Sequence, residues 1–172
     1  MVDAETIGVL ITAASVSIAA IYYTMTLRTQ RENMRQTLET RQISLIDSIM
    51  TRALNEEGMR NYIELLNCEW SDYEDFERKY GMETDVGITA RRYSQWQLYN
   101  SIGMMVRKDM VKAEDIYDMG IGMGMIWLWE KYQPIIDEIR RRYNGSEYLK
   151  NFEYLAQEMS KVKTARDNLS GT

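Results

Sequence analysis

The sequence predicts an all-α protein with a single N-terminal transmembrane helix, a stalk helix and a small cytoplasmic helical bundle. Three observations lead to this fold class: a long uncharged stretch near the start, an abundance of helix-forming residues after it, and a single proline, Pro134. Alternating β-branched residues, which are typical of strands, are scarce. We predict an anchor over residues 1–27, a polar stalk over 28–42, the bundle over 43–164 and a frayed tail over 165–172.

The predicted anchor contains 22 consecutive uncharged residues, from Thr6 to Leu27. A helix of this length, at a rise of 1.5 Å per residue, would be about 33 Å long and could cross the hydrocarbon core of a bilayer. Tyr22 and Tyr23 stand near its end, where aromatic side chains anchor a helix at the membrane interface. The lipid bilayer is therefore the first partner that the sequence predicts.

The charges around this stretch predict its orientation. Asp3 and Glu5 precede it, whereas a cleaved signal peptide begins with positive charges. A cleaved signal remains the alternative, because Ser17–Ala19 resembles a cleavage site. We predict a retained single-pass helix in the cell membrane, with the N-terminus outside and the C-terminal domain in the cytoplasm. Arginines that follow the stretch would meet anionic headgroups, and these are Arg28, Arg31 and Arg35.

Small residues form two stripes along one half of the predicted transmembrane helix, and large aliphatic residues occupy the opposite side. Small residues allow two helices to approach closely, and hydroxyl groups can hydrogen bond across such a contact. This pattern predicts a homo-oligomer or packing against another membrane protein. The first stripe is Gly8, Thr12, Ser15 and Ala19, and the second contains Ala13, Ser17 and Ala20.

After the anchor, the residues favour one helix that leaves the membrane and becomes amphipathic near Ile43. Within the bundle, Ser71 with Glu74 three residues later predicts the N-terminal cap of a helix that ends at Gly81. The next helix is predicted over residues 84–106, and its buried stripe includes Trp96, Tyr99 and Gly103.

Two further helices complete the predicted bundle. One opens at Glu114, carries three glycines and ends at Asn144 and Gly145. The last begins at Ser146 and carries Phe152 in its buried stripe. From these two helices we predict that the bundle-packing residues are Gly120, Gly122, Gly124, Trp127, Trp129 and Phe152.

The glycine run in "YDMGIGMGMIWLWEKY" could bind a phosphate or serve a helix contact. A dinucleotide loop needs Gly-x-Gly-x-x-Gly after a strand, but position 125 is Met and the preceding residues favour a helix. We therefore predict no nucleotide binding and one buried helix with two closely packed faces. Gly122 and Trp129 would face the bundle core. Gly120 and Gly124, with Trp127, would face a second helix of the same chain or a partner.

The composition argues against most catalytic chemistry. The chain has no histidine, which removes the usual general base and the commonest transition-metal ligand. Its one cysteine, Cys68, can form neither an intramolecular disulfide nor a zinc cluster. The net charge is −5 and no basic stripe with aromatic residues occurs, so nucleic-acid binding is disfavoured. We predict no catalytic residue, cofactor or metal ligand.

Several segments carry a distinctive order of Trp, Tyr, Pro and Gly residues after the anchor and stalk: "NCEWSDYEDFERKYG", "YNSIGMMVRKDMV", "WLWEKYQPII" and "NFEYLAQE". This order resembles an uncharacterised family of single-pass membrane proteins with a cytoplasmic helical domain of unknown function, found in prokaryotes and frequent in archaea. The resemblance covers nearly the whole chain. It implies the fold and the topology, and it implies no activity.

These patterns predict a non-enzymatic, membrane-anchored interaction or scaffold module that self-associates or serves as an accessory subunit of a membrane complex. The alternative is a homo-oligomeric membrane pore in which Thr12, Ser15 and Ser17 line the lumen. A third hypothesis is a hydrolase with Glu130 as its acid, since apolar surroundings raise the pKa of a carboxyl group. An exposed helix charge is the simpler interpretation of Glu130.

Overall fold

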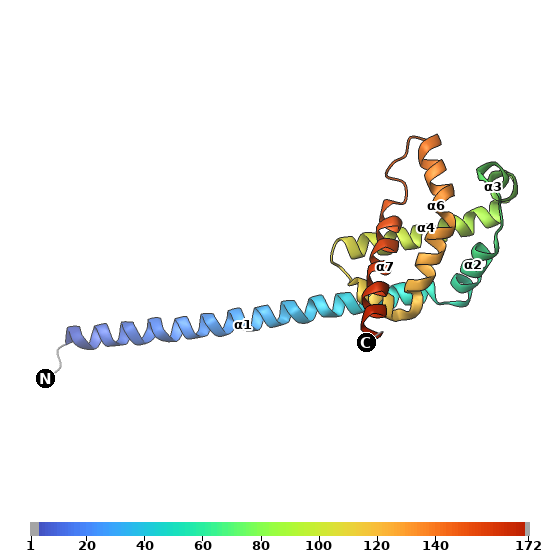
Figure 1. The fold of residues 1–172 in the computed structure, drawn as a ribbon. Helices are drawn as coiled ribbons and strands as arrows, with labels where there is room; N and C mark the ends of the chain where they lie inside the picture. The colour runs from blue at the N-terminus through green and yellow to red at the C-terminus, as the bar shows by residue number, and fades with distance from the viewer. Residues whose placement is uncertain (1–3, 171–172) are drawn as a thin grey trace. The chain divides into compact units, whose positions relative to one another are not determined.

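The computed structural model describes the backbone of residues 4–170 and the side chains of residue 8 and residues 13–169 (Figure 1). The backbone of the described residues is mostly helical and contains no strand, which confirms the all-α class. The chain divides into two compact units, Met1–Ile43 and Ser44–Thr172.

The first unit is the larger part of helix α1, which runs from Ala4 to Ala53. Its polar section is reinforced by pairs within the helix, because Arg35 lies 2.7 Å from a carboxylate oxygen of Glu32 and 3.5 Å from one of Glu39. Such pairs one turn apart stabilise an exposed helix modestly, by about 0.2–0.5 kcal/mol each. The last turns of α1 belong to the second unit, where Ile49 and Ala53 are buried.

The second unit packs short and long helices around one core (Figure 1). Helices α4 and α6 both pack against α7, α2 packs against α4 and α6, and α3 packs against α6. In chain order the elements are α2 (Glu56–Asn67), α3 (Tyr73–Tyr80), α4 (Val86–Arg107), α5 (Ala113–Ile116), the π-helix η1 (Tyr117–Ile121), α6 (Gly122–Arg142) and α7 (Lys150–Ser170).

Aromatic side chains fill much of this core in two groups. Tyr132 of α6 is central to the first group: its ring centroid lies 4.9 Å from that of Trp70 and 5.3 Å from that of Trp96, and its hydroxyl donates to the Leu65 carbonyl at 3.0 Å. Buried aromatic pairs at such distances add about 0.5–1.5 kcal/mol to the free energy of burial. The second group joins α4, α6 and α7 through Tyr99, Trp129 and Phe152.

Helix α7 starts later than the sequence predicts, at Lys150 rather than Ser146. Its first amide groups are capped by a distant side chain, since Asn100 of α4 accepts hydrogen bonds from the backbone N–H groups of Asn151 and Phe152, each at 3.2 Å. Leu149 has a positive φ of 56° immediately before the helix. The predicted start is wrong because the cap comes from another helix.

The cap of α3 is also displaced, from Ser71 to Asp72. The Asp72 carboxylate accepts from the backbone N–H of Asp75 at 2.8 Å, and the Asp75 carboxylate accepts from the N–H of Ser71 at 3.1 Å. This resembles a capping box built from two aspartates, with the difference that the second hydrogen bond comes from the residue before the cap rather than from the cap itself. Asp75 also forms ion pairs with Lys79 and Arg78.

The sequence predicts that the glycine run lies in one uninterrupted helix, and this prediction is wrong. Helix α5 passes into η1, in which Gly120 has φ 81°, and α6 begins at Gly122. A left-handed backbone costs a residue with a side chain roughly 1–2 kcal/mol, so glycine is the suitable residue there. Gly120 therefore marks a change of helix geometry rather than a close contact.

Candidate interaction surfaces

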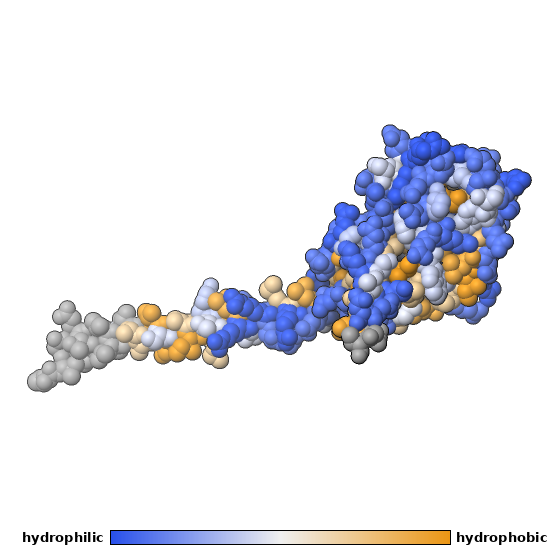
Figure 2. Space-filling model, in the orientation of Figure 1, coloured by the Kyte–Doolittle hydropathy of each residue, from blue (hydrophilic) through white to orange (hydrophobic). Residues whose placement is uncertain are grey.

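The part of α1 before the stalk exposes many apolar side chains. The described residues from Ala13 to Met25 are exposed or only partly buried, and the large apolar side chains among them are between 61% and 72% exposed. Figure 2 shows these hydrophobic residues along α1, next to the blue polar stalk. Soluble chains rarely leave such a surface uncovered. The exposed set is Val16, Ile18, Ile21, Tyr22, Tyr23 and Met25.

Hydroxyl groups in this segment are satisfied within the helix. Ser17 donates to the Ala13 carbonyl at 2.8 Å, Thr24 to the Ala20 carbonyl at 2.8 Å, and Thr26 to the Tyr22 carbonyl at 2.9 Å. A hydroxyl that already has an acceptor is less costly to place in an apolar environment. These residues therefore place no unpaired hydroxyl donor on the apolar surface.

The residues of the predicted small stripes are only partly described. Gly8 is exposed, as are Ala13, Ser15, Ser17, Ala19 and Ala20. Thr12 lies outside the residues whose side chains the structure describes, and so do the other side chains at positions 6, 7 and 9–11. Within the described part of the chain, no helix combines the length and the apolar character needed to cross a bilayer.

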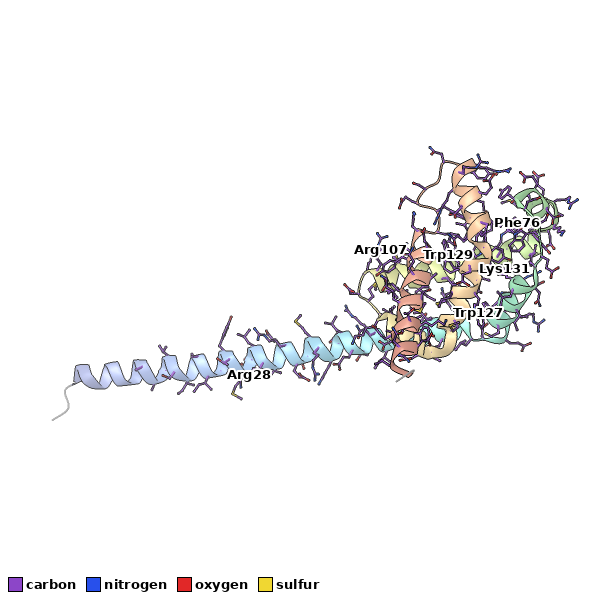
Figure 3. The ribbon with its side chains drawn as sticks, viewed as in Figure 1. Arg28, Phe76, Arg107, Trp127, Trp129 and Lys131 are labelled. Atoms are coloured by element: carbon purple, nitrogen blue, oxygen red, sulfur yellow. The ribbon has the colours of Figure 1, made fainter. Side chains whose placement is uncertain are left out.

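The arginines predicted at the membrane interface are all exposed. Arg35 is engaged by Glu32 and Glu39, and hydrogen bonding to Glu32 raises the pKa of Arg35. Arg28 and Arg31 form no salt bridge with any residue that the structure describes. Arg28, labelled in Figure 3, and Arg31 thus carry charges that no carboxylate of the described chain offsets.

A second apolar surface surrounds Trp127, in the unit formed by residues 44–172. It is a groove of about 250 Å³ between the end of α1, α2 and the start of α6. The Trp127 side chain is 53% exposed, although the sequence analysis predicts that it packs in the bundle. Trp127 and Trp129 lie on different sides of α6, and only Trp129 is buried (Figure 3). The groove is lined mainly by Ala53, Leu54, Met59, Tyr62, Met123 and Trp127.

Gly124 and Gly120 have different roles in this groove. A Cβ atom at Gly124 would lie 2.9 Å from the Tyr62 hydroxyl oxygen, so α2 of the same chain meets this glycine. A Cβ atom at Gly120 would have no described atom within 4 Å. The face predicted to meet either a second helix or a partner is thus filled by α2 at Gly124 and open at Gly120.

The remaining predicted packing residues lie inside the bundle. Trp96, Tyr99, Trp129 and Phe152 are buried. Gly122 is buried against Tyr117, whose ring carbon would lie 2.5 Å from an added Cβ atom. Gly103 is buried where α4 approaches α7, and its close contact is with the backbone of Asn151.

The partners of the glycines could not be identified from helical periodicity. Met59 and Tyr62 line the groove from α2, far from the glycine run in the chain. Helical periodicity predicts which face of α2 is buried, but not which distant helix lies opposite that face. The nearest signal in the sequence was the presence of Met and Trp residues, which are also common in ordinary cores.

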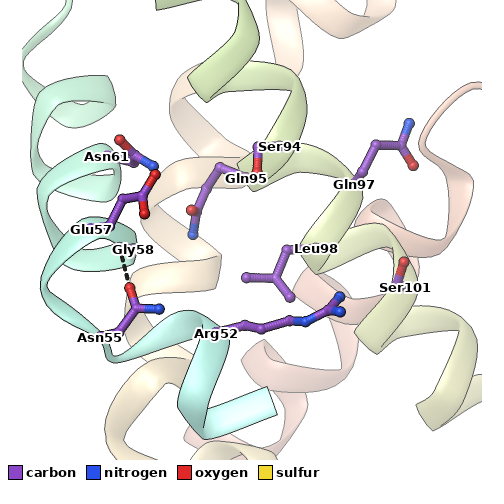
Figure 4. A pocket seen from close by; sticks show the side chains of 10 residues that line it. All are labelled: Arg52, Asn55, Glu57, Gly58, Asn61, Ser94, Gln95, Gln97, Leu98 and Ser101. Carbon is purple, nitrogen blue, oxygen red and sulfur yellow. Dashed lines mark hydrogen bonds between the residues drawn. The ribbon is translucent and has the colours of Figure 1, made fainter. Parts of the chain in front are cut away.

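A separate polar pocket of about 450 Å³ lies between the end of α1, α2 and α4 (Figure 4). Asn55 at its edge caps α2, since its side-chain oxygen accepts from the Gly58 N–H at 2.6 Å. Gln95, on the α4 side, is buried, and Glu57 and Arg52 are exposed.

Reactive groups are not gathered into a centre within the described residues. Cys68 is buried, and desolvation raises the pKa of its thiol, which disfavours the reactive thiolate. Glu130 is exposed on α6. Among the residues whose side chains the structure describes, no group of three or more His, Cys, Asp and Glu side chains is placed to hold a metal ion.

Comparison with known proteins gives one match. A search of curated proteins and a search of solved structures give none. A family model described as a domain of unknown function, DUF4760, matches residues 9–159, which include both part of the predicted anchor and nearly all of the bundle. This description concerns neither membrane attachment nor archaeal origin. The chain belongs to the DUF4760 family.

Proposed function

We propose that this protein is a membrane-anchored, non-enzymatic interaction module. The observation that carries the proposal is the row of exposed apolar side chains on α1 between Val16 and Met25. In the sequence this row lies within 22 uncharged residues, which is enough to span a bilayer as a helix. Lipid would cover the apolar surface that the described chain leaves exposed.

The charges on both sides of the segment support the proposed orientation. Asp3 and Glu5 lie before it, and Arg28 and Arg31 follow it without a carboxylate partner among the described residues. Positive charges next to a membrane helix stay on the cytoplasmic side. The bundle would therefore lie in the cytoplasm, and protease added outside intact cells should leave it uncut.

Membrane attachment can be tested by fractionation. We expect the wild-type chain to sediment with membranes after an alkaline wash and to require detergent for release. Replacing both Ile18 and Ile21 by Asp should move it to the supernatant, since each aspartate costs about 2.5–3.5 kcal/mol at the centre of a membrane helix. The matched control is Ile43→Asp, which changes an equally exposed apolar residue beyond the segment. Wild-type chain in the supernatant would overturn the proposal.

The proposed activity of the anchor is self-association through its small residues. Ala13 and Ala20 are exposed on the described helix, two turns apart, where a second helix could approach closely. We expect the double variant Ala13→Leu with Ala20→Leu to be monomeric in mild detergent. Ile18→Leu, on the opposite side of the helix, should keep the wild-type mass. A wild-type chain that is already monomeric by light scattering contradicts this part of the proposal.

A further inference from the structure

A large cavity opens in the second unit, away from the Trp127 groove. It has a volume of about 760 Å³ and lies between α3, the segment that follows α3, the first turns of α4 and the segment that joins α6 to α7. This is within the usual range of about 300–1,000 Å³ for small-molecule sites. Among its lining residues are Tyr73, Glu77, Arg92, Tyr93, Tyr143 and Tyr148.

Arg92 places a buried positive charge in the wall of this cavity. The side chain is only 4% exposed, and one terminal nitrogen, Nη1, donates to the Tyr80 carbonyl at 2.8 Å. The guanidinium carbon lies 4.6 Å from the centre of the Phe76 ring and 5.3 Å from that of Trp96. The aromatic rings and one carbonyl thus hold the guanidinium in place without neutralising it.

Arg92 forms no ion pair within the described chain, although the Glu77 carboxylate in the same cavity is close enough to favour its charged form. None of the salt bridges among residues 13–169 includes Arg92, and its Nε–H is buried without a hydrogen-bond acceptor. Burial lowers the pKa of this guanidinium. A buried ionic group without a partner is costly, and each such group in a native protein calls for an explanation.

Tyr148 supplies a second unsatisfied group to the same cavity. Its hydroxyl is buried and makes no hydrogen bond of normal length within the described chain, and burial together with the neighbouring Tyr93 side chain raises its pKa. Tyr148 comes from the segment before α7, whereas Arg92 comes from α4. A guanidinium and a phenolic hydroxyl are both donors to a carboxylate, and hydrogen bonds to a charged acceptor are the stronger kind.

The other walls select among anions. Tyr73, Tyr93 and Ile139 provide aromatic and aliphatic surface for an apolar body. Glu77 and Glu83 also line the cavity; they repel every anion, and they repel a multiply charged one such as phosphate more strongly than a single carboxylate. The combination of one buried cation, one hydroxyl and apolar walls therefore fits a single carboxylate attached to an apolar group.

We propose that this cavity binds a small monocarboxylate with an aromatic or apolar body, whose carboxylate accepts hydrogen bonds from Arg92 and Tyr148. This gives the bundle a ligand-binding role that is independent of membrane attachment. The bound carboxylate would neutralise Arg92, so binding should also stabilise the folded bundle.

The first test uses 3-phenylpropionate as the probe and the full chain in a mild non-ionic detergent. We expect saturable binding by titration calorimetry and a rise in Tm. The control ligand is 3-phenylpropan-1-ol, which keeps the body and replaces the carboxylate by a hydroxyl, and it should bind at least about tenfold more weakly. Equal binding of acid and alcohol, no binding of the acid, or tighter binding of inorganic phosphate would each overturn the proposal.

The second test uses variants. Tyr148→Phe removes the buried hydroxyl and should weaken binding of 3-phenylpropionate about tenfold. Tyr143→Phe is the matched control, because Tyr143 lines the same cavity but is 75% exposed, and it should bind as the wild type does. Arg92→Met should abolish binding. If that variant does not fold, Tyr148→Phe alone decides, and wild-type affinity in Tyr148→Phe contradicts the assignment.

Discussion

Gly103 is the residue on which the close approach of α4 and α7 depends. A Cβ atom at this position would lie 1.9 Å from the Asn151 carbonyl oxygen and 2.6 Å from its carbonyl carbon. Both atoms belong to the backbone, so the contact cannot be relieved by turning a side chain. The two helices would have to move apart, and the capping of α7 by Asn100 would be disturbed with them.

We therefore expect Gly103→Ala to lower the free energy of unfolding by roughly 1–3 kcal/mol or more, as overpacking in a core does. Chemical denaturation followed by tryptophan fluorescence measures this change. Gly145→Ala is the control, since its nearest described atom would lie 3.9 Å from the added Cβ atom. Equal stability of the two variants would contradict the close approach of α4 and α7 at Gly103.

Helix α3 allows the displaced cap to be tested. Asp72 accepts the hydrogen bond from the Asp75 N–H, whereas Ser71 contributes its own N–H as a donor. Asp72→Ala should cost about 1 kcal/mol, the usual effect of removing a cap. Ser71→Ala keeps the backbone donor and should cost little. A larger fall in Tm for Ser71→Ala than for Asp72→Ala would instead support Ser71 as the cap, as the sequence predicts.

Two carboxylates, Asp75 at the start of α3 and Glu138 near the end of α6, should make the free energy of unfolding depend on pH in the acidic range. Hydrogen bonds from Lys79 and Arg78 hold the pKa of Asp75 well below its usual range, and those from Arg141 and Arg142 lower the pKa of Glu138 to about 2. Such groups bind protons more weakly in the folded chain than in the unfolded chain. They stabilise the fold above the unfolded pKa, and the stabilisation is lost as the pH falls through the folded pKa.

For Glu138 this loss should occur between about pH 4.5 and pH 2. We expect the free energy of unfolding to fall in that window and to fall less steeply in Glu138→Gln. Denaturant titrations at several pH values measure the slope. Glu130→Gln is the control, because Glu130 forms no salt bridge with the described residues. A slope in Glu138→Gln equal to that of the wild type contradicts the expected linkage.

At the scale of the whole molecule, the second unit has its own core, and the last turns of α1 contribute Ile49 and Ala53 to it. A chain that begins at Ser44 should therefore fold with the helical content and cooperative unfolding of the bundle. A chain that begins at Leu54 lacks both buried residues and should lose several kcal/mol, since losing the buried Ile49 side chain alone costs about 2–5 kcal/mol. Circular dichroism with thermal unfolding compares them, and equal stability would show that α1 is dispensable to the core.

Much of the fold follows from local properties of the chain. The helical class follows from residue propensities and from apolar periodicity, which act within one or two turns. The uncharged stretch before Arg28 can be recognised without any tertiary contact, because a membrane would act on it as a continuous segment. The burial of Trp96, Tyr99 and Phe152 agrees with the apolar periodicity of their helices.

The arrangement of the helices decided the rest. Asn100 caps a helix far along the chain, Tyr62 meets Gly124, and Arg92 shares a cavity with Tyr148. Single-sequence periodicity carries no information about which buried faces meet. The sequence by itself determined the helices and the apolar segment, and only the tertiary structure decided which polar groups remain buried without partners, because that depends on contacts between residues distant in the chain.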